Sequence, residues 1–117
     1  MKDYRELKVW QRSHALTLEV YRLSKGFPRE EIFSLTQQMR RASSSVGANI
    51  AEGCGRDGDA ELKRFLTIAL GSACELDYFI LLARDLGYLE PNPVDTLAQE
   101  TLEVRKMLGA LIRKLKA

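Results

Sequence analysis

The residues best suited to chemistry in this sequence are two carboxylates, Glu52 and Glu75. Both lie in helix-like segments, so a helical bundle could bring them together as di-metal carboxylate proteins do. Such a site needs four carboxylates and Glu-x-x-His pairs. The chain has a single histidine, His14, and no such pair. We therefore expect no metal site.

A structural role suits these carboxylates better than a catalytic one. A buried carboxylate is costly unless it is paired, and an arginine fork can hold two oxygens at once. The sequence predicts a semi-buried polar network with four members: Arg41, Asn49, Glu52 and Glu75.

The nucleophilic residues lack the partners that catalysis needs. Ser43, Ser44 and Ser45 have no base and acid at a recognisable spacing. Cys54 follows Gly53 at an expected helix end, where the negative end of the helix dipole disfavours a thiolate. No phosphate-binding loop and no dinucleotide-binding fingerprint occurs. The sequence predicts a protein that is not an enzyme and uses no cofactor.

Basic residues form three clusters, which favour binding as the function. The clusters are Arg40 with Arg41; Arg56 with Lys63 and Arg64; and Arg105, Lys106, Arg113, Lys114 and Lys116. Each could be a solvated face paired with nearby acids, but several copies around one axis would form a ring of charge that suits phosphates. We expect phosphate contacts from Arg56, Lys63 and Arg64, with Arg40 as a second choice.

The sequence leaves two classes of binding partner open, a nucleic acid and a protein. The net charge is only +2, from 18 basic and 16 acidic residues, and Asp57, Asp59 and Glu61 could neutralise the central cluster. Since no base-reading motif is present, binding of RNA or DNA would depend on backbone charge and shape. The alternative is a protein-interaction scaffold that docks a partner enzyme without contacting nucleic acid.

Four long segments must position these residues. Turn signals at 25–28, 53–59 and 87–93 separate them, and no segment alternates apolar and polar residues as a strand would. This pattern predicts an all-α, antiparallel four-helix bundle as a single domain over residues 1–117. The expected helices cover roughly residues 8–25, 34–54, 59–86 and 93–116.

Local signals mark the ends of these helices. Residues 34–37 match a capping box, and Asp57 or Asp59 can cap the third helix. Gly87 suits the left-handed position that closes that helix. Asn92-Pro93 combines a capping residue with a first-turn proline, which predicts the start of the fourth helix.

The apolar pattern predicts more than one interface. The fourth helix has a single stripe, whereas apolar residues cover well over half of the third helix. Since large exposed apolar patches are uncommon on monomers, we expect a homo-oligomer; the alternative is a third helix that simply lies deeper. Small residues in 42–53 should pack closely against Ala69, Gly71, Ser72 and Ala73.

The remaining features set the expected compartment. No apolar run looks long enough to span a bilayer, and the N-terminus lacks an apolar signal core. Cys54 and Cys74 form no CxxC pair, which favours reduced thiols. We expect a cytoplasmic protein with no membrane partner.

Three blocks of the sequence match those of a known family: LTQQMRRA (35–42), SVGANIAEG (45–53) and IALGSACEL (68–76). Together with residues 7–10, Tyr21 and Phe27-Pro28, they resemble the four-helix bundle proteins encoded by intervening sequences of 23S ribosomal RNA genes. The resemblance covers nearly the whole chain, although the family often has proline where this chain has Gly47. It implies a homopentamer without established enzyme activity. It also implies distant kinship with the accessory variability proteins of diversity-generating retroelements, which bind nucleic acid and a reverse transcriptase.

Overall fold

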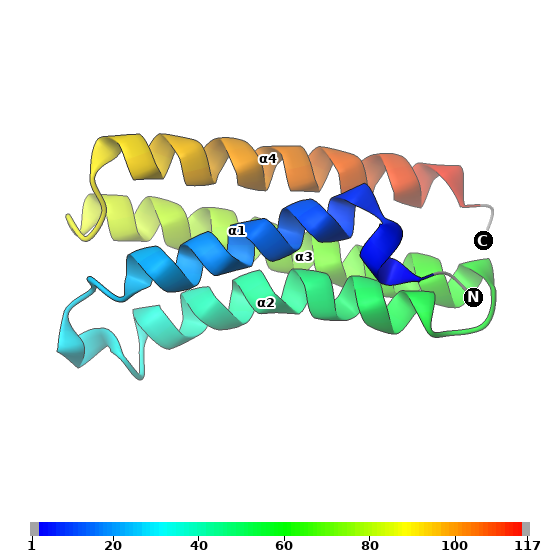
Figure 1. The fold of residues 1–117 in the computed structure, drawn as a ribbon, viewed down its shortest axis with the longest axis horizontal. Helices are drawn as coiled ribbons and strands as arrows, with labels where there is room; N and C mark the ends of the chain where they lie inside the picture. Colours follow the sequence, from blue (N-terminus) through cyan, green and yellow to red (C-terminus); the bar gives the residue numbers. More distant parts are fainter. Residues whose placement is uncertain (1–2, 116–117) are drawn as a thin grey trace.

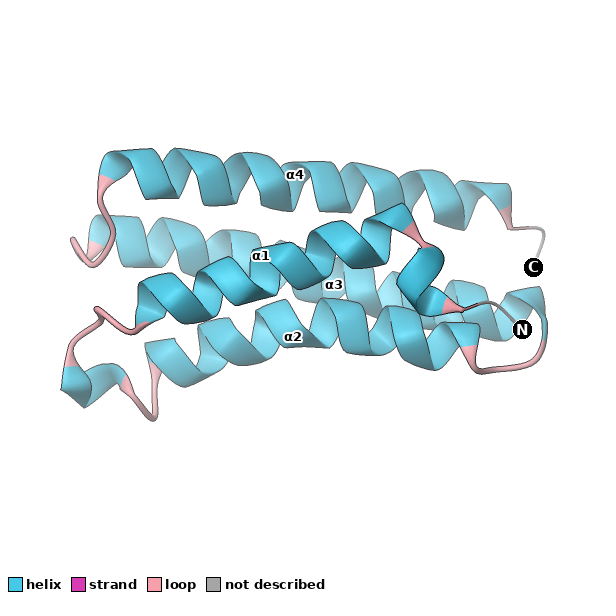
Figure 2. Cartoon of the chain, viewed as in Figure 1, coloured by secondary structure: helices cyan, strands magenta, loops and turns pink. Residues whose placement is uncertain are grey.

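Four long helices make up most of the computed structural model, which describes residues 3–115 (Figure 1). They are α1 (Lys8–Ser24), α2 (Leu35–Cys54), α3 (Gly58–Asp85) and α4 (Pro91–Lys114). Two short 3-10 helices, η1 (Tyr4–Glu6) and η2 (Arg29–Glu31), precede α1 and α2. Figure 2 shows helices and loops and no strand in the described residues. The predicted all-α, four-helix architecture is confirmed.

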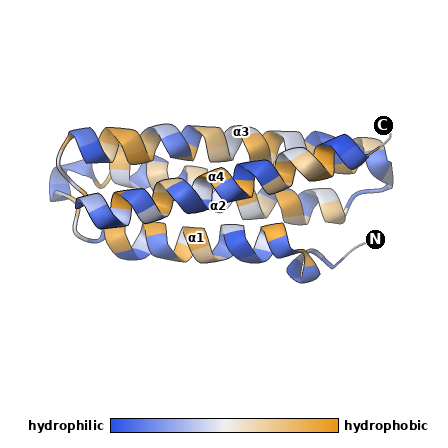
Figure 3. Cartoon of the chain, turned by 90° about the horizontal axis from the view of Figure 1, so that it is seen from above, coloured by the Kyte–Doolittle hydropathy of each residue, from blue (hydrophilic) through white to orange (hydrophobic). Residues whose placement is uncertain are grey.

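The helices are arranged as an antiparallel bundle. Consecutive helices are joined at alternate ends, and α1 closes the bundle by packing against both α2 and α4 (Figure 1). The third helix likewise contacts α2 and α4. Hydrophilic and hydrophobic residues alternate along each helix, as expected for helices with one buried side (Figure 3). The start of α1, the end of α4 and the α2–α3 connection lie at one end of the bundle.

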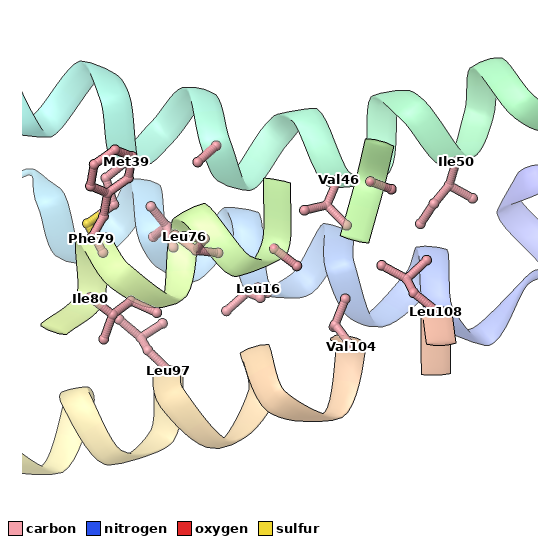
Figure 4. Close-up of a cluster of buried hydrophobic side chains, with 14 of the residues drawn as sticks. Leu16, Met39, Val46, Ile50, Leu76, Phe79, Ile80, Leu97, Val104 and Leu108 are labelled. Atoms are coloured by element: carbon pink, nitrogen blue, oxygen red, sulfur yellow. The ribbon is translucent and has the colours of Figure 1, made fainter. Parts of the chain in front are cut away.

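The core runs the length of the bundle and receives side chains from all four helices (Figure 4). The predicted stripe of α4 is buried through most of its length. Its buried members are Val94, Leu97, Thr101, Val104 and Leu108. The buried hydroxyl of Thr101 is satisfied within α4, because it donates a hydrogen bond to the Leu97 carbonyl at 2.7 Å.

The start of α2 differs from the predicted capping box. Ser34 is the N-cap residue, but its side chain makes no capping hydrogen bond. The Glu31 carboxylate accepts from the Leu35 amide at 3.3 Å instead, and it also accepts from the Tyr88 hydroxyl at 2.8 Å. The Tyr88 hydrogen bond lowers the pKa of Glu31, and the same contact raises the pKa of Tyr88. A carboxylate in η2 thus ties the α3–α4 connection to the start of α2.

The other helix ends are set largely by backbone geometry. Gly87 has φ of +78°, as predicted, and the amides of Gly87 and Tyr88 bond to the Arg84 and Ala83 carbonyls at 3.0 and 2.9 Å. Asp57 is the N-cap residue of α3 but makes no side-chain cap. The helix α4 begins at Pro91, so Asn92 lies inside it and is not its cap. Pro91 is suited to that position because its ring fixes φ and the first helical amide has no partner within the helix.

The helix α3 meets the length and hydropathy criterion for a membrane-spanning segment. By length and composition alone, α3 is long and apolar enough to cross a membrane, which corrects the expectation that no run reaches that length. Core helices of globular bundles pass the same test, and α3 packs against α2 and α4 here. Cys54, which is buried, and Cys74, which is exposed, form no disulfide in the described residues.

Candidate interaction surfaces

The small residues of α2 allow α3 to approach closely. A Cβ added at Gly53 would lie 2.9 Å from the Phe65 Cβ, closer than carbon atoms normally approach. Further along, the Ser45 and Ser72 hydroxyls share a hydrogen bond of 2.9 Å between the two helices. The predicted close packing against residues 69–73 is confirmed at Ser45 and Ser72, whereas Gly53 meets α3 one turn earlier, at Phe65.

Two glycines lie outside this crossing. Gly71 is exposed, and an added Cβ there would meet nothing within 4 Å, so its place in the predicted contact is wrong. Gly47 faces α1, where an added Cβ would lie 3.2 Å from the Trp10 Nε1. The Thr17 hydroxyl also donates to the Ser43 carbonyl at 3.0 Å. The small residues of α2 therefore serve a second helix contact, with α1.

The predicted polar network is divided into separate parts. Asn49 donates to the Ser45 carbonyl at 2.8 Å, while Glu52 pairs with Arg56 at 3.3 Å. Glu52 lies on the outer side of α2, so the arginine one turn later reaches it more readily than any core partner. Arg41 and Glu75 remain together, on the walls of a groove between α2 and α3.

The central basic cluster is only partly assembled. The guanidinium carbons of Arg56 and Arg64 lie 5.1 and 4.4 Å from the centre of the Phe65 ring. Both arginines are paired, and the bond from Arg64 lowers the pKa of Glu61, its partner at 3.0 Å. Nearby carboxylates thus neutralise Arg56 and Arg64, which is one of the two alternatives that the sequence left open.

Lys63 lies at a different angle on α3 from Arg64, because adjacent helix positions are about 100° apart. It lies four helical turns before Asp77, on the same side of α3. Asp77 pairs with Arg105 of α4 at 3.8 Å, so this side of α3 adjoins α4. Arg64, by contrast, turns toward Phe65 at the α2 contact.

Arg40 has a structural role that the sequence did not reveal. Its Nε donates to the Ser24 hydroxyl at 2.8 Å, and its Nη2 donates to the Tyr21 carbonyl at 3.4 Å. The guanidinium also lies 4.8 Å from the centre of the Tyr21 ring. These groups lie in the last turn of α1, where a cation is favoured by the helix dipole. Arg40 thus helps to hold α1 to α2, and its predicted role as a second-choice phosphate contact stays a prediction.

The cluster on α4 gains a member from α1. Lys8 and Lys114 both line a groove of about 240 Å³ with mostly apolar walls. Neither lysine, nor the neighbouring Arg113, takes part in an ion pair within residues 3–115. Lys116 lies outside the described residues. The antiparallel arrangement explains the addition, since the start of α1 and the end of α4 meet at one end of the bundle.

Exposed apolar side chains form a surface between α1 and α2. Leu18 is 58% exposed, and Phe33, in the turn before α2, is 85% exposed. Trp10 is half-buried and stacks on His14 at 4.9 Å, and both line a groove of about 430 Å³ with Leu18. Phe33 was missed in the sequence, although two consecutive apolar residues in a polar connection were the available signal.

Two predictions about chemistry concern metal-binding side chains and the serines of α2. No group of three His, Cys, Asp or Glu side chains in residues 3–115 could hold a metal ion. The hydroxyls of Ser43 and Ser44 donate to carbonyls one turn back, at 2.9 and 3.3 Å.

Comparison with known proteins supports the family suggested by the sequence blocks. No curated protein matches the chain. Among solved structures, the chain is similar to a protein of unknown function from the S23 ribosomal protein family of Bacteroides thetaiotaomicron, with 26% identity and a TM-score of 0.84. That match covers 91% of this chain and 96% of the other. The 23S rRNA-intervening sequence protein family matches residues 5–110, and with the four-helix fold this shows that the chain belongs to that family.

Proposed function

We propose that this chain is a non-enzymatic bundle subunit that associates with copies of itself and acts by binding a macromolecule. The supporting observation is the amount of apolar side chain exposed on the single chain. The large apolar residues with at least two-fifths of their surface exposed are Leu18, Tyr21, Ile32, Phe33, Ile68, Tyr78, Leu81 and Leu86. Monomeric proteins rarely leave extended apolar patches uncovered.

Self-association would cover part of this surface, and docking of a partner protein could cover the rest. Five copies is the number that the resemblance to the family implies. Light scattering at micromolar concentration should give the mass of several subunits. A single monomer peak across the concentration range would refute the assembly proposal.

Nucleic-acid binding is the second candidate, and the cations at the end of the bundle where α1 begins and α4 ends favour it. Lys8 and Lys114 flank one groove without ion pairs in the described residues. Arg56 and Arg64 have exposed carboxylate partners, and such surface pairs contribute little to stability, so phosphates could replace the carboxylates. The similar Bacteroides protein is named for a ribosomal protein family, which agrees with an RNA partner.

A filter-binding titration of structured RNA and duplex DNA at two salt concentrations separates the candidates. Phosphate contacts make affinity fall steeply with salt. The triple variant Arg56→Ala, Lys63→Ala and Arg64→Ala tests the central cluster, and Lys8→Ala with Lys114→Ala tests the groove cluster. Loss of affinity and a shallower salt slope in one variant would identify the site. No binding by the wild type at low salt would leave the protein-docking function.

A further inference from the structure

The groove between the start of α1 and the end of α4 combines apolar walls with positive charge (Figure 1). Its volume is about 240 Å³, and its apolar walls are formed by Leu7, Val9, Met107, Ala110 and Leu111. Lys8 and Lys114 also line it; both are exposed and take part in no ion pair within residues 3–115. No aspartate or glutamate belongs to the described lining. Two uncompensated cations therefore lie beside an apolar surface.

The α4 wall of this groove follows from helix geometry. Residues 107, 110, 111 and 114 recur at intervals of three and four, so they lie on one side of the helix. Met107 and Leu111 pack against the core but stay half-buried, so part of each side chain remains accessible. The flexible thioether of a methionine adapts to irregular partner surfaces. This wall can therefore accept apolar side chains from outside the bundle.

Helix stability accounts for only one of the two lysines. Lys114 lies in the last turn of α4, where the negative end of the helix dipole favours a cation. Lys8 is the first residue of α1, at the positive end, and the first turn of α1 has no acidic residue to offset it. The helix dipole thus gives no reason for a lysine at this position, which nevertheless places a second cation on the groove.

Charge and wall chemistry together select the kind of occupant. Phosphates match the lysines, but a nucleic acid has little to place on the apolar walls, and the described lining has no aromatic ring on which a base could stack. The larger groove between α1 and α2 has such rings but no lysine, arginine, aspartate or glutamate, so nothing in its lining selects the charge of an occupant. A protein segment can supply both apolar side chains for the walls and carboxylates for the lysines.

We propose that the groove between α1 and α4 docks an acidic segment of a partner protein, one that presents apolar side chains flanked by Asp or Glu. The apolar side chains cover Met107 and Leu111, and the carboxylates meet Lys8 and Lys114 at the edges of the groove. An amphipathic helix laid along a groove is a common form of such recognition. The inference rests on the macromolecule binding proposed above and assigns this groove to a protein partner.

Two synthetic helical peptides test the charge preference. Both present leucine on one face; one carries glutamate and the other carries lysine on both sides of that face. Binding is followed by NMR of the methionine and leucine methyl groups at a fixed protein concentration. The acidic peptide should shift the Met107 methyl signal and bind at least about tenfold more tightly than the basic peptide, because like charges at an interface suppress the wrong partner.

Charge reversal in the groove should reverse this preference. In the double variant Lys8→Glu with Lys114→Glu, the basic peptide should bind more tightly than the acidic one. Lys25→Glu with Arg29→Glu is the matched control, since both are exposed cations that follow the other end of α1 and have no ion pair in the described residues. This control should keep the preference of the wild type.

The inference would be overturned if the acidic peptide left the Met107 signal unchanged, if both peptides bound equally, or if the groove variant kept the preference of the wild type. A shift of Met107 by structured RNA but not by the acidic peptide would assign the groove to nucleic acid instead. A Met107 signal that changes on dilution alone would show that a second copy covers the groove. In each case the proposed macromolecule binding would stand or fall separately, by light scattering and filter binding.

Discussion

Adding one methyl group at Gly53 tests the closest approach in the bundle. Gly53 lies in the last turn of α2, buried against α3. In Gly53→Ala the new Cβ would lie 2.9 Å from the Phe65 Cβ and 3.2 Å from the Leu62 Cδ1. Both neighbours belong to α3, so the methyl group can be accepted only if the two helices separate or Phe65 shifts.

The expected change in stability is the difference of two opposing terms. Overpacking a buried contact costs about 1–3 kcal/mol. Replacing glycine by alanine in a helix recovers roughly 0.5–1 kcal/mol of conformational free energy. The net result should be a destabilisation on the order of 1 kcal/mol, which corresponds to a melting temperature lower by about 4 °C for a chain of this size.

The assay is urea unfolding followed by circular dichroism, with all proteins at one subunit concentration because assembly contributes to stability. Gly109→Ala is the matched control. An added Cβ there meets only the mobile end of the Arg113 side chain, at 3.3 Å, so the helix gain should appear almost alone. The two variants should therefore differ by about 1–3 kcal/mol in free energy of unfolding.

Equal stabilisation by Gly53→Ala and Gly109→Ala would refute the reasoning. It would mean that α2 and α3 have room for a methyl group at Gly53, and that the small residues of α2 are not required by the crossing with α3.

Three further changes test other contacts. Ala73 is fully buried, so Ala73→Leu should cost about 1–3 kcal/mol; an unchanged urea midpoint would contradict its burial. The lowered pKa of Glu31 means that the stability it contributes is present above its ordinary pKa of about 4.3 and is lost as pH falls through the lower folded value. Tyr88→Phe should shrink this acid-side loss in urea titrations at several pH values, and an unchanged pH dependence would argue against the contact. Arg40→Ala should destabilise by about 1–2 kcal/mol through its lost bond to Ser24, without changing the affinity for nucleic acid; a salt-dependent loss of that affinity would identify Arg40 as a phosphate contact.

Much of the fold could be predicted because its signals are local or periodic. The stripe from Val94 to Leu108 repeats every three or four residues, which only a helix with one buried side satisfies. Gly87 is similar, since a left-handed residue at a helix end has a strong preference for glycine. The capping box at Ser34 failed because Glu31, three residues earlier in η2, supplies the acceptor for the Leu35 amide. A pattern of residue types does not reveal that competition.

The candidate site was less predictable because charged side chains are long and choose among several partners. Arg40 and Arg41 are neighbours in the sequence, yet Arg40 bonds to α1 whereas Arg41 lines the α2–α3 groove. Adjacent helix positions are about 100° apart around the helix axis, so neighbouring residues can face different helices. Arg64 shows the same dependence on position, since its guanidinium lies over the Phe65 ring.

The sequence by itself determined the class of fold, the number of helices and the family. These follow from signals that are local in the chain: hydrophobic periodicity, turn residues, and the blocks at 35–53 and 68–76. Only the tertiary structure decided how the charges are used. It paired Glu52 with Arg56, engaged Arg40 at the end of α1, and left Arg41 and Glu75 unpaired on one groove. The physical reason is that an ion pair depends on distances between side chains of different helices, and those distances are set by packing rather than by spacing along the chain.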